Sequence, residues 1–484
     1  MEGQSAREKL EGRLGKELSE KYRGIEALLA LTDSRVEVSA GDPEAGLQRL
    51  LALDTLRGKK AVTQAVLGML APVLWALTGI RYRSVPKAKT RLVYSNTFLS
   101  SVRYPAAREQ IEKEFGCTAL VTFLDTLKPG SRGGNSLREL LRLDQGKVRP
   151  VFFRDWSVCG GALRRAASRY CFLAYGPDHS AASDRNRLDK ALQSLEKAYG
   201  KRVKRLERRL GKEDVTLYTT INQYNLRDLL IIHACRNLGI RTLQQEHHTI
   251  QFCQDQFDEN RPKPRLSFAG EYGFWNRTEL LFHRKVYRFD SLLYPENEIR
   301  MHVTGNPEMV FEQAELYRRK YPPERKLTYM TAILENWQDP EIRDAYLKWR
   351  WDIYKGLKEL SERQKIAINI RYRPFSEQEF REKEIPVLKE WGFLISESLP
   401  ENLMEDLCSS SVIMSATSSV LSTARLFGKL TYRVEDLSFR NSLMDKEVHD
   451  VSVEGIPDIV IPEGIENTAQ EIDREGTFNI HNIL

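Results

Sequence analysis

From about residue 90 onward, short apolar runs alternate with amphipathic stretches, and this alternation constrains the fold more than any other feature. The runs at 91–98, 117–124 and 215–220 have the length and the β-branched or aromatic content of buried strands. A long helical pattern covers 188–210. Strands that alternate with helices are typical of a parallel sheet covered by helices, so the sequence predicts an α/β fold.

The alternation falls into two blocks, separated by a polar, Pro-containing segment at 254–265. Further strands are expected at 149–153, 240–245, 266–271, 300–303, 326–331, 366–370, 393–396, 412–415 and 430–434. We therefore expect two Rossmann-like, doubly wound domains that face a cleft. The expected divisions are a helical region at 1–88, a first Rossmann-like domain at 89–262, a second at 263–440, and a tail at 441–484 that packs back on the body.

Charge and cysteine content exclude several classes of protein. The 484 residues hold 74 Lys and Arg against 67 Asp and Glu, and the formal charge of +7 is too small an excess to indicate nucleic-acid binding. The six cysteines form no CxxC pair, so no zinc site is expected and a reducing cytoplasm fits best. The first residues are charged and lack the apolar core of a signal peptide.

One apolar segment, residues 61–80, is flanked by Lys59, Lys60, Arg81 and Arg83. Its length would cross a bilayer, although Pro72 disfavours a span. A basic-flanked apolar helix is also typical of an interfacial anchor. Three interpretations stay open: a buried core helix, a peripheral contact through 59–83 with the inner face of the plasma membrane, and a span.

Two amphipathic helices are predicted outside that segment. Residues 1–30 carry an apolar stripe, which predicts a helix packed on its own domain or on a second copy; its members are Leu10, Leu14, Leu18, Tyr22, Ile25 and Leu29. The helix at 188–210 has one apolar and one basic face. A solvated surface is the first interpretation of the basic face, and contact with anionic lipid head groups or an acidic polymer is the alternative.

Polar residues follow four of the expected strands, where doubly wound sheets bind their ligands. After 240–245 come Glu246 and His247, which could supply a general base. After 300–303 comes a Thr-Gly-Asn-Pro turn, in which Gly305 permits a close approach of the backbone. Asn306 leads into a helix that is expected to begin near Glu308, and the exposed amides at the start of that helix could bind phosphate.

The other two segments belong to the second block. Arg371 and Arg373 follow the strand expected at 366–370. In an extended chain their side chains point to the same side, which suits binding of a diphosphate or a carboxylate. Thr417, Ser418 and Ser419 lie between a strand and a helix expected at 421–427, where hydroxyls and amides can hold phosphate. Surface ion pairs and ordinary helix caps are the alternatives.

Taken in order, these segments resemble those of the GT-B glycosyltransferases of bacterial surface-polysaccharide synthesis. The families in question are the Kdo and sialic-acid transferases of capsule assembly and the CDP-glycerol glycerophosphotransferases of teichoic acid synthesis. Glu246-His247-His248 is similar to their QHG-like segment, and Val303–Pro307 to their VTGNP turn. Arg371–Pro374 resembles their R-x-HP motif, and Thr417–Ser419 followed by Gly428-Lys429 resembles their Ser-rich loop and GKP.

The resemblance implies a metal-independent glycosyltransferase of the GT-B fold that needs no cofactor. It would move a sugar or a polyol phosphate from a nucleotide-activated donor, CMP- or CDP-linked, to a growing cell-surface glycan or lipid-linked acceptor. The donor would bind the second half through Gly305, Asn306, Arg371, Arg373, Thr417, Ser418 and Ser419. The acceptor would bind the first half, where His247 is the first candidate for the base, with Glu246 and Asp125 behind it.

Three positions depart from the family pattern. Thr423 stands where many GT-B enzymes have a glutamate for the donor ribose, Arg373 replaces a histidine, and His248 replaces a glycine. These departures leave two alternatives open: a catalytically inactive GT-B-like protein that binds glycan or acts as a scaffold, and a nucleotide-sugar epimerase. A Rossmann oxidoreductase is disfavoured because no GxGxxG follows any expected strand.

Overall fold

The structure is a computed structural model of the 484-residue chain. It describes residues 4–37, 39, 41–50, 91–94, 110, 118–122, 148–152, 160–175, 182–212, 215–220, 225–246, 252–253, 263–307, 309–331, 340–372, 378–396, 402–416, 420–434, 441–442, 448–467 and 471–479.

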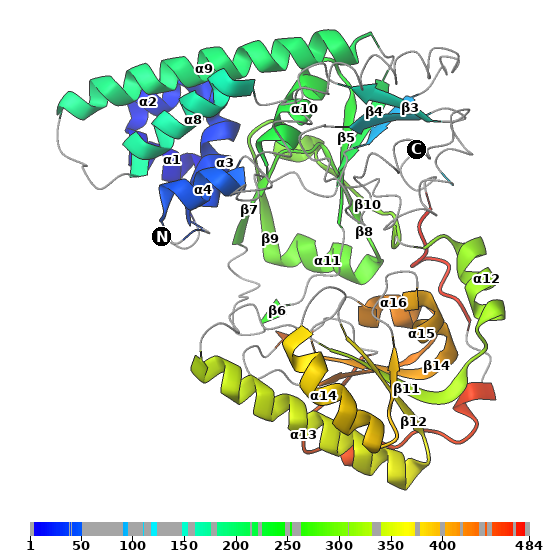
Figure 1. The fold of residues 1–484 in the computed structure, drawn as a ribbon. Helices are drawn as coiled ribbons and strands as arrows, with labels where there is room; N and C mark the ends of the chain where they lie inside the picture. The colour runs from blue at the N-terminus through cyan, green and yellow to red at the C-terminus, as the bar shows by residue number, and fades with distance from the viewer. Residues whose placement is uncertain are drawn as a thin grey trace.

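Seven parallel strands form the first sheet, in the order β10-β8-β5-β4-β1-β2-β3 (Figure 1). Their bounds are β1 (Arg91–Tyr94), β2 (Thr118–Thr122), β3 (Val148–Phe152), β4 (Val215–Thr220), β5 (Arg241–Gln245), β8 (Glu271–Phe274) and β10 (Arg300–Val303). From β1 the chain adds β2 and β3 on one side, and then β4, β5, β8 and β10 on the other side. The direction of winding therefore reverses between β1 and β4. This is the doubly wound topology, whose ligands bind beyond the carboxyl ends of the strands.

Four helices follow strands of this sheet: α8 (Gly160–Tyr175), α9 (Ala182–Leu210), α10 (Leu226–Asn237) and α11 (Arg277–Val286). The helix predicted at 188–210 is confirmed as part of α9, which buries one apolar face against α8 and α10. That face is formed by Leu192, Leu195, Tyr199, Val203, Leu206 and Leu210. Beside the sheet, β7 (Lys263–Ser267) and β9 (Tyr287–Ser291) form a separate parallel pair.

The N-terminal helices pack on the same core. They are α1 (Ala6–Leu14), α2 (Lys16–Lys21), the 3-10 turn Arg23–Ile25, α3 (Glu26–Glu37) and α4 (Pro43–Leu50). All six residues of the predicted apolar stripe are buried, as expected for a helix packed on its own domain. The prediction of one continuous helix is wrong, because Gly15 adopts a positive φ of 78° that ends α1.

The second sheet has six parallel strands in the order β13-β12-β11-β14-β15-β17 (Figure 1). The bounds are β11 (Glu324–Met330), β12 (Ala367–Arg371), β13 (Leu394–Ser396), β14 (Ser410–Ser415), β15 (Leu430–Val434) and β17 (His449–Val451). Counted along the chain, this is the 3-2-1-4-5-6 order of the Rossmann fold, which reverses between β11 and β14. The expectation of two Rossmann-like domains is therefore confirmed.

Helices α13 (Pro340–Gln364), α14 (Gln378–Glu390), α15 (Leu403–Ser409) and α16 (Val420–Leu426) follow strands of this second sheet. Residues of α13 pack on the sheet and bury Trp349, Ile353 and Leu357. Before the sheet, α12 (Phe311–Lys320) starts at Phe311, later than the start expected near Glu308.

The change from one sheet to the other lies between Val303 and Glu324, and not near residue 263 as the sequence suggested. Strands β8 and β10, expected in the second domain, belong to the first sheet because β8 pairs with β5. The single strand expected at 266–271 is also wrong: β7 ends at Ser267 and β8 begins at Glu271. The polar segment at 254–265 therefore does not mark the change of sheet.

Segments from both halves meet outside the two sheets. Strand β16 (Asn441–Ser442) pairs antiparallel with β6 (Phe252–Cys253). Residues 471–479, which we call the closing segment, contact both halves: Asp473 N donates to Leu426 O of α16, and Phe478 N donates to Met309 O beyond β10. Short 3-10 turns at Glu296–Glu298, Ile456–Asp458 and Ile465–Asn467 complete the described elements.

No helix in the described part of the chain is both long enough and apolar enough to cross a membrane. The apolar segment at 59–83 lies outside the described residues, so its three interpretations stay predictions.

Candidate functional site

Three neighbouring strands of the first sheet bring predicted site residues to one carboxyl edge. Glu246 follows β5, and Gly305 and Asn306 follow β10, with β8 between these strands. Thr304 Oγ1 donates to Gln245 Oε1 at 2.7 Å, which ties the end of β10 to the end of β5. The structure therefore brings Glu246 and the Thr-Gly-Asn-Pro turn to the same edge, as the parallel arrangement predicted.

The backbone of Glu246 is held on both sides by residues of the β8 region. Its N–H donates to Gly273 O at 2.9 Å, and its carbonyl accepts from Trp275 Nε1 at 2.7 Å. Gly273 is required for this packing, because a Cβ there would lie 2.6 Å from Gln245 Oε1. Glu246 consequently has a fixed backbone at the point where the chain enters the segment that carries His247.

The Glu246 side chain is buried in an ion pair. Arg265 on β7 approaches it, with Nη2 2.6 Å from Oε1. The exposed fractions of the two side chains are 6% for Glu246 and 13% for Arg265. This geometry orients the carboxylate and excludes most solvent from it.

Arg265 also reaches a buried histidine, His283 on α11. Its Nη1 lies 2.8 Å from His283 Nδ1. A guanidinium only donates, so Nδ1 accepts and the proton of the neutral ring lies on Nε2. Burial, aided by the charge of Arg265, lowers the pKa of His283 to about 2. His283 is therefore neutral at physiological pH and stabilises the position of Arg265.

The Thr-Gly-Asn-Pro turn is covered by the closing segment. The amide of Gly305 donates to Phe274 O at 3.2 Å, and that of Asn306 donates to Gly476 O at 2.8 Å. Asn479 N donates to Thr304 O. Gly305 has a φ of +77°, and a Cβ at this position would lie 1.9 Å from Thr477 O. The amides of Gly305 and Asn306, two of the expected donor-binding residues, are therefore bonded to protein carbonyls in this structure.

Asn306 connects the two halves of the chain. Its Nδ2 donates to Thr423 Oγ1 on α16 at 3.2 Å, and both residues are buried. Thr423 is the position where many GT-B enzymes have a glutamate for the donor ribose. In this chain its hydroxyl bonds to Asn306 instead, so the departure in sequence corresponds to a contact between the halves.

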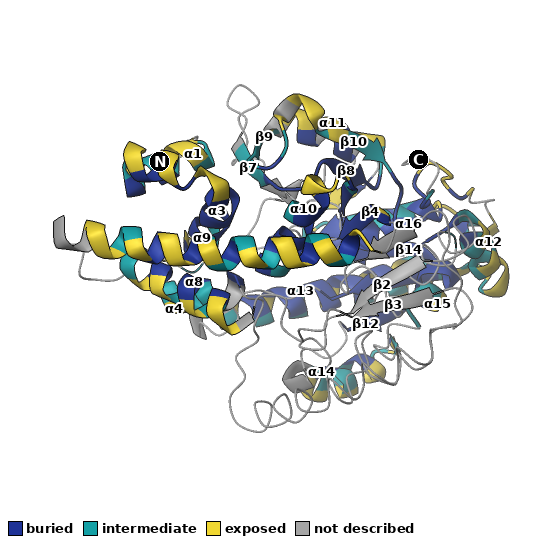
Figure 2. Cartoon of the chain, turned by 90° about the horizontal axis from the view of Figure 1, so that it is seen from above, coloured by how far each residue is buried: buried dark blue, intermediate teal, exposed yellow. Residues whose placement is uncertain are grey.

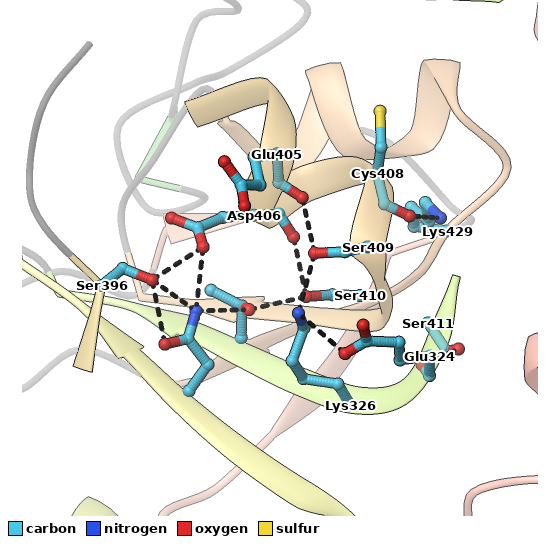
Figure 3. Close-up of polar contacts among 12 residues, drawn as sticks. Glu324, Lys326, Ser396, Glu405, Asp406, Cys408, Ser409, Ser410, Ser411 and Lys429 are labelled. Atoms are coloured by element: carbon cyan, nitrogen blue, oxygen red, sulfur yellow. Dashed lines mark hydrogen bonds and ion pairs between the residues drawn. The ribbon is translucent and has the colours of Figure 1, made fainter. Parts of the chain in front are cut away.

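Arg371 ends β12 and pairs with Asp406 of α15. The exposed fraction of its side chain is 4%. Asp406 also accepts from Ser396 Oγ at 2.7 Å and from Asn369 Nδ2 at 3.2 Å (Figure 3). Arg371 thus lies in a buried polar network that joins β12, β13 and α15.

A second group of hydrogen bonds extends this network along the sheet. Lys326 Nζ donates to Ser409 Oγ at 2.7 Å, and Thr328 and Ser410 hydroxyls lie 2.6 Å apart (Figure 3). Beside them, Lys429 Nζ donates to Cys408 O at 2.7 Å. Burial lowers the pKa of Lys429 to about 8. These buried contacts fix α15 on β11 and β14.

Arg371 also lies close to the reversal point of the second sheet. Its carbonyl accepts from Thr331 N at 3.0 Å, and Met330 of β11 pairs with Ser415 of β14. Since neighbouring strands are about 5 Å apart, the ends of β12 and β14 lie roughly 10 Å from one another. The Ser-rich segment that follows Ser415 therefore starts about two strands from Arg371.

The remaining predicted site residues lie outside the described part of the chain: Asp125, His247, Arg373, Thr417, Ser418 and Ser419. The strands that precede them, β2, β5, β12 and β14, are present where expected. The positions and roles of these six residues stay predictions. Among the described residues, no group of three or more His, Cys, Asp or Glu side chains could hold a metal ion.

Sequence reasoning missed the partners of these residues. Arg265 had been assigned to a linker, and Asp406 and the closing segment had no expected role. Asp228 was missed as well: it lies in the first turn of α10 beside the reversal point of the first sheet and accepts from Thr220 Oγ1 and Asn225 Nδ2. A local signal existed for this last site, because Asn225 precedes Asp228 by three residues at a helix start.

No protein-family model matches the sequence, and no curated protein matches it. Solved structures give weak similarities. UDP-GlcNAc 2-epimerase from Methanocaldococcus jannaschii aligns over 80% of this chain and 96% of its own, with 13% identity and a TM-score of 0.41. The same enzyme from Neisseria meningitidis bound to UDP-GlcNAc gives 13% identity over 81% and 97%, with a TM-score of 0.43.

The wall teichoic acid polymerase TagF aligns over 77% of this chain and 78% of its own, with 11% identity and a TM-score of 0.34. Scores this low carry no assignment. The fold therefore rests on the strand orders of the two sheets, each of which is parallel and doubly wound.

Proposed function

We propose that this chain is a metal-independent glycosyltransferase of the GT-B type. It would transfer a sugar or a polyol phosphate from a nucleotide-activated donor, CMP- or CDP-linked, to a growing cell-surface glycan such as a capsule. The observation that carries the proposal is the presence of two parallel, doubly wound sheets in one chain, tied together at Asn306 and Thr423. In such sheets ligands bind beyond the carboxyl ends of the strands.

On the donor side, Arg371 and Arg373 would bind the phosphates together with the segment Thr417–Ser419. Support comes from the position of Arg371 at the end of β12, about two strands from the end of β14. Gly305 and Asn306 would contribute to the donor site by lining the contact between the two halves. Charge on the leaving group would be stabilised by these fixed donors.

On the acceptor side, His247 would act as the base that takes the proton of the attacking hydroxyl. Glu246 would support it, since its backbone is held by Gly273 and Trp275 and its carboxylate by Arg265. Asp125, three residues beyond β2, is the third candidate. A cytoplasmic enzyme that extends a lipid-linked acceptor would meet it at the membrane, where the apolar segment at 59–83 is proposed to make a peripheral contact.

A second candidate is a GT-B-like protein without catalytic activity, which binds glycan or acts as a scaffold. A specific observation favours it: several groups expected to bind substrate are bonded within the protein. Arg371 pairs with Asp406, Glu246 pairs with Arg265, and the amides of Gly305 and Asn306 donate to carbonyls. A scaffold requires no nucleotide, so nucleotide affinity separates the two candidates.

The test is a thermal-shift screen of the full chain against CMP, CDP, UDP, GDP and ADP. A nucleotide at about 100 times its Kd adds roughly 2.7 kcal/mol of stability, which raises the melting temperature of the binding domain by roughly 5–10 °C. Arg373→Ala should abolish the shift, whereas Arg363→Ala, which removes an exposed arginine paired with Asp458, should keep it.

Three outcomes are informative. A shift with one cytidine nucleotide, lost only in Arg373→Ala, supports the transferase and its donor class. A shift with UDP, followed by interconversion of UDP-sugars without acceptor, replaces the transferase with an epimerase. Absence of any shift favours the inactive glycan-binding protein.

A further inference from the structure

Exposed cations line the outer face of α9 over most of its length. Lys190, Lys197, Lys201, Lys204 and Arg208, which we call the cation row, are all exposed. Successive members are three, four or seven residues apart, so they lie on one side of the helix. That side is opposite the buried face of α9, and the row extends over about 27 Å at a rise of 1.5 Å per residue.

Among the described residues, no acidic side chain neutralises the cation row. Asp189 bonds to Lys21 of α2 at 2.7 Å, and Glu207 accepts from Asn237 at the end of α10 at 2.7 Å. Both carboxylates therefore bind residues of neighbouring helices, on the sides of α9 that pack against α2 and α10. Within the part of the chain that the structure describes, no member of the cation row forms an ion pair.

The cation row lies at an open edge of the molecule. In Figure 1, α9 runs along the edge of the first domain that is remote from the second sheet. Figure 2, seen from above, shows an exposed stripe that continues along α9, with no other described helix or strand in front of it. None of the described elements therefore separates the row from a flat surface.

The shape and chemistry of the row favour a lipid surface over a nucleic acid. The outer face is a straight, convex helix, whereas proteins that bind single strands use a groove with aromatic stacking platforms. Further exposed positions near the row carry the cations Arg187 and Arg205 and the neutral polar side chains of Asn186, Gln193 and Ser194, with no aromatic residue among them. Four of the row's five cations are lysines, compact point charges that suit anionic head groups without fixed geometry.

We propose that the cation row of α9 binds the surface of a bilayer that contains anionic lipids. The five cations would lie parallel to the membrane plane, with the buried face of α9 and both sheets on the side away from it. This contact is electrostatic and independent of the segment at 59–83. It does not depend on the proposed transferase activity, because a scaffold with the same helix would bind equally.

The test measures binding of the full chain to phosphatidylcholine vesicles with and without phosphatidylglycerol. The row variant Lys197→Gln/Lys201→Gln/Lys204→Gln is compared with Lys348→Gln/Lys355→Gln/Lys358→Gln on α13. Both lower the formal charge of +7 by three, but the control lysines each pair with an acid, Asp352 or Glu362. Since a lysine near an anionic surface contributes about fivefold in affinity, the row variant should bind about a hundredfold more weakly.

We expect binding to anionic vesicles only, loss of binding in the row variant, no loss in the control variant, and release at high salt. Equal losses in both variants would show that net charge alone is responsible, and would overturn the proposal. Unchanged binding in the row variant would overturn it too and would assign the contact to another segment, such as 59–83. Preference for duplex DNA over anionic vesicles, lost in the row variant, would replace the lipid with nucleic acid.

Discussion

Gly305→Ala is the substitution whose effect follows most directly from the structure. At a φ of +77°, any residue with a Cβ costs about 1–2 kcal/mol of backbone strain. In addition, the new Cβ would lie 1.9 Å from Thr477 O, closer than atoms in contact can approach. The clash is with backbone, so no side-chain rotation relieves it, and the closing segment has to move away from the turn.

The cost of moving the closing segment can be worked out from its contacts. Three backbone hydrogen bonds connect it to residues 304–309, each worth about 1 kcal/mol. Phe478 is buried there and contributes about 2 kcal/mol. Detachment thus costs about 5 kcal/mol, and Gly305→Ala should lower the free energy of unfolding by roughly 6–7 kcal/mol once strain is included.

Gly392→Ala is the matched control. Gly392 has a φ of +80°, but no atom lies within 4 Å of a Cβ placed there, so only the strain of about 1–2 kcal/mol applies. Urea unfolding of both variants, followed by circular dichroism, gives the difference. Limited proteolysis should also cleave the closing segment faster in Gly305→Ala. The reasoning is refuted if the two variants lose the same stability and the closing segment stays protected.

Three further substitutions test the described contacts by chemical unfolding. Arg265→Ala leaves the Glu246 carboxylate buried without its partner and should lower the free energy of unfolding by about 3–5 kcal/mol. Adding Glu246→Gln removes the buried charge, so the double variant should recover part of this loss. Equal stability of the single and double variants would contradict this reasoning. Thr423→Val should cost about 1–3 kcal/mol by removing the acceptor of Asn306, whereas Thr423→Ser should not. Burial raises the pKa of Asp33 from 3.8 to about 7, so the folded chain binds a proton that the unfolded chain releases, and stability should fall as the pH rises from about 4 to 7. Asp33→Asn should flatten this profile, and an unchanged slope would exclude Asp33 as its source.

Elements that depend on local pattern were predictable. The helix α9 was expected because its apolar residues recur every three or four positions, and β4 and β11 because β-branched and aromatic residues are enriched in them. Short α15 was not among the expected helices. The sheet to which β8 belongs was also missed, because its pairing with β5 depends on contacts between distant segments.

In the candidate site, too, features that depend on local sequence could be predicted, and contacts between distant residues could not. The positions of Glu246, Asn306 and Arg371 at strand ends could be predicted, since any parallel sheet puts its carboxyl ends on one edge. Their partners could not. Arg265 lies 19 residues from Glu246, and Asp406 lies 35 residues from Arg371, and nothing local to either residue indicates the pairing. Whether a strand-end residue faces solvent or a buried partner is decided by tertiary packing.

The closing segment has a consequence for biosynthesis. Both sheets are complete in the chain before residues 471–479 are translated, and domains generally fold as units while the chain emerges from the ribosome. The turn at Gly305 therefore exists for a time without its cover, with the amide of Asn306 open to water. That period ends when residues 471–479 emerge, because the amide of Asn306 then bonds to Gly476 O and the amide of Phe478 to Met309 O.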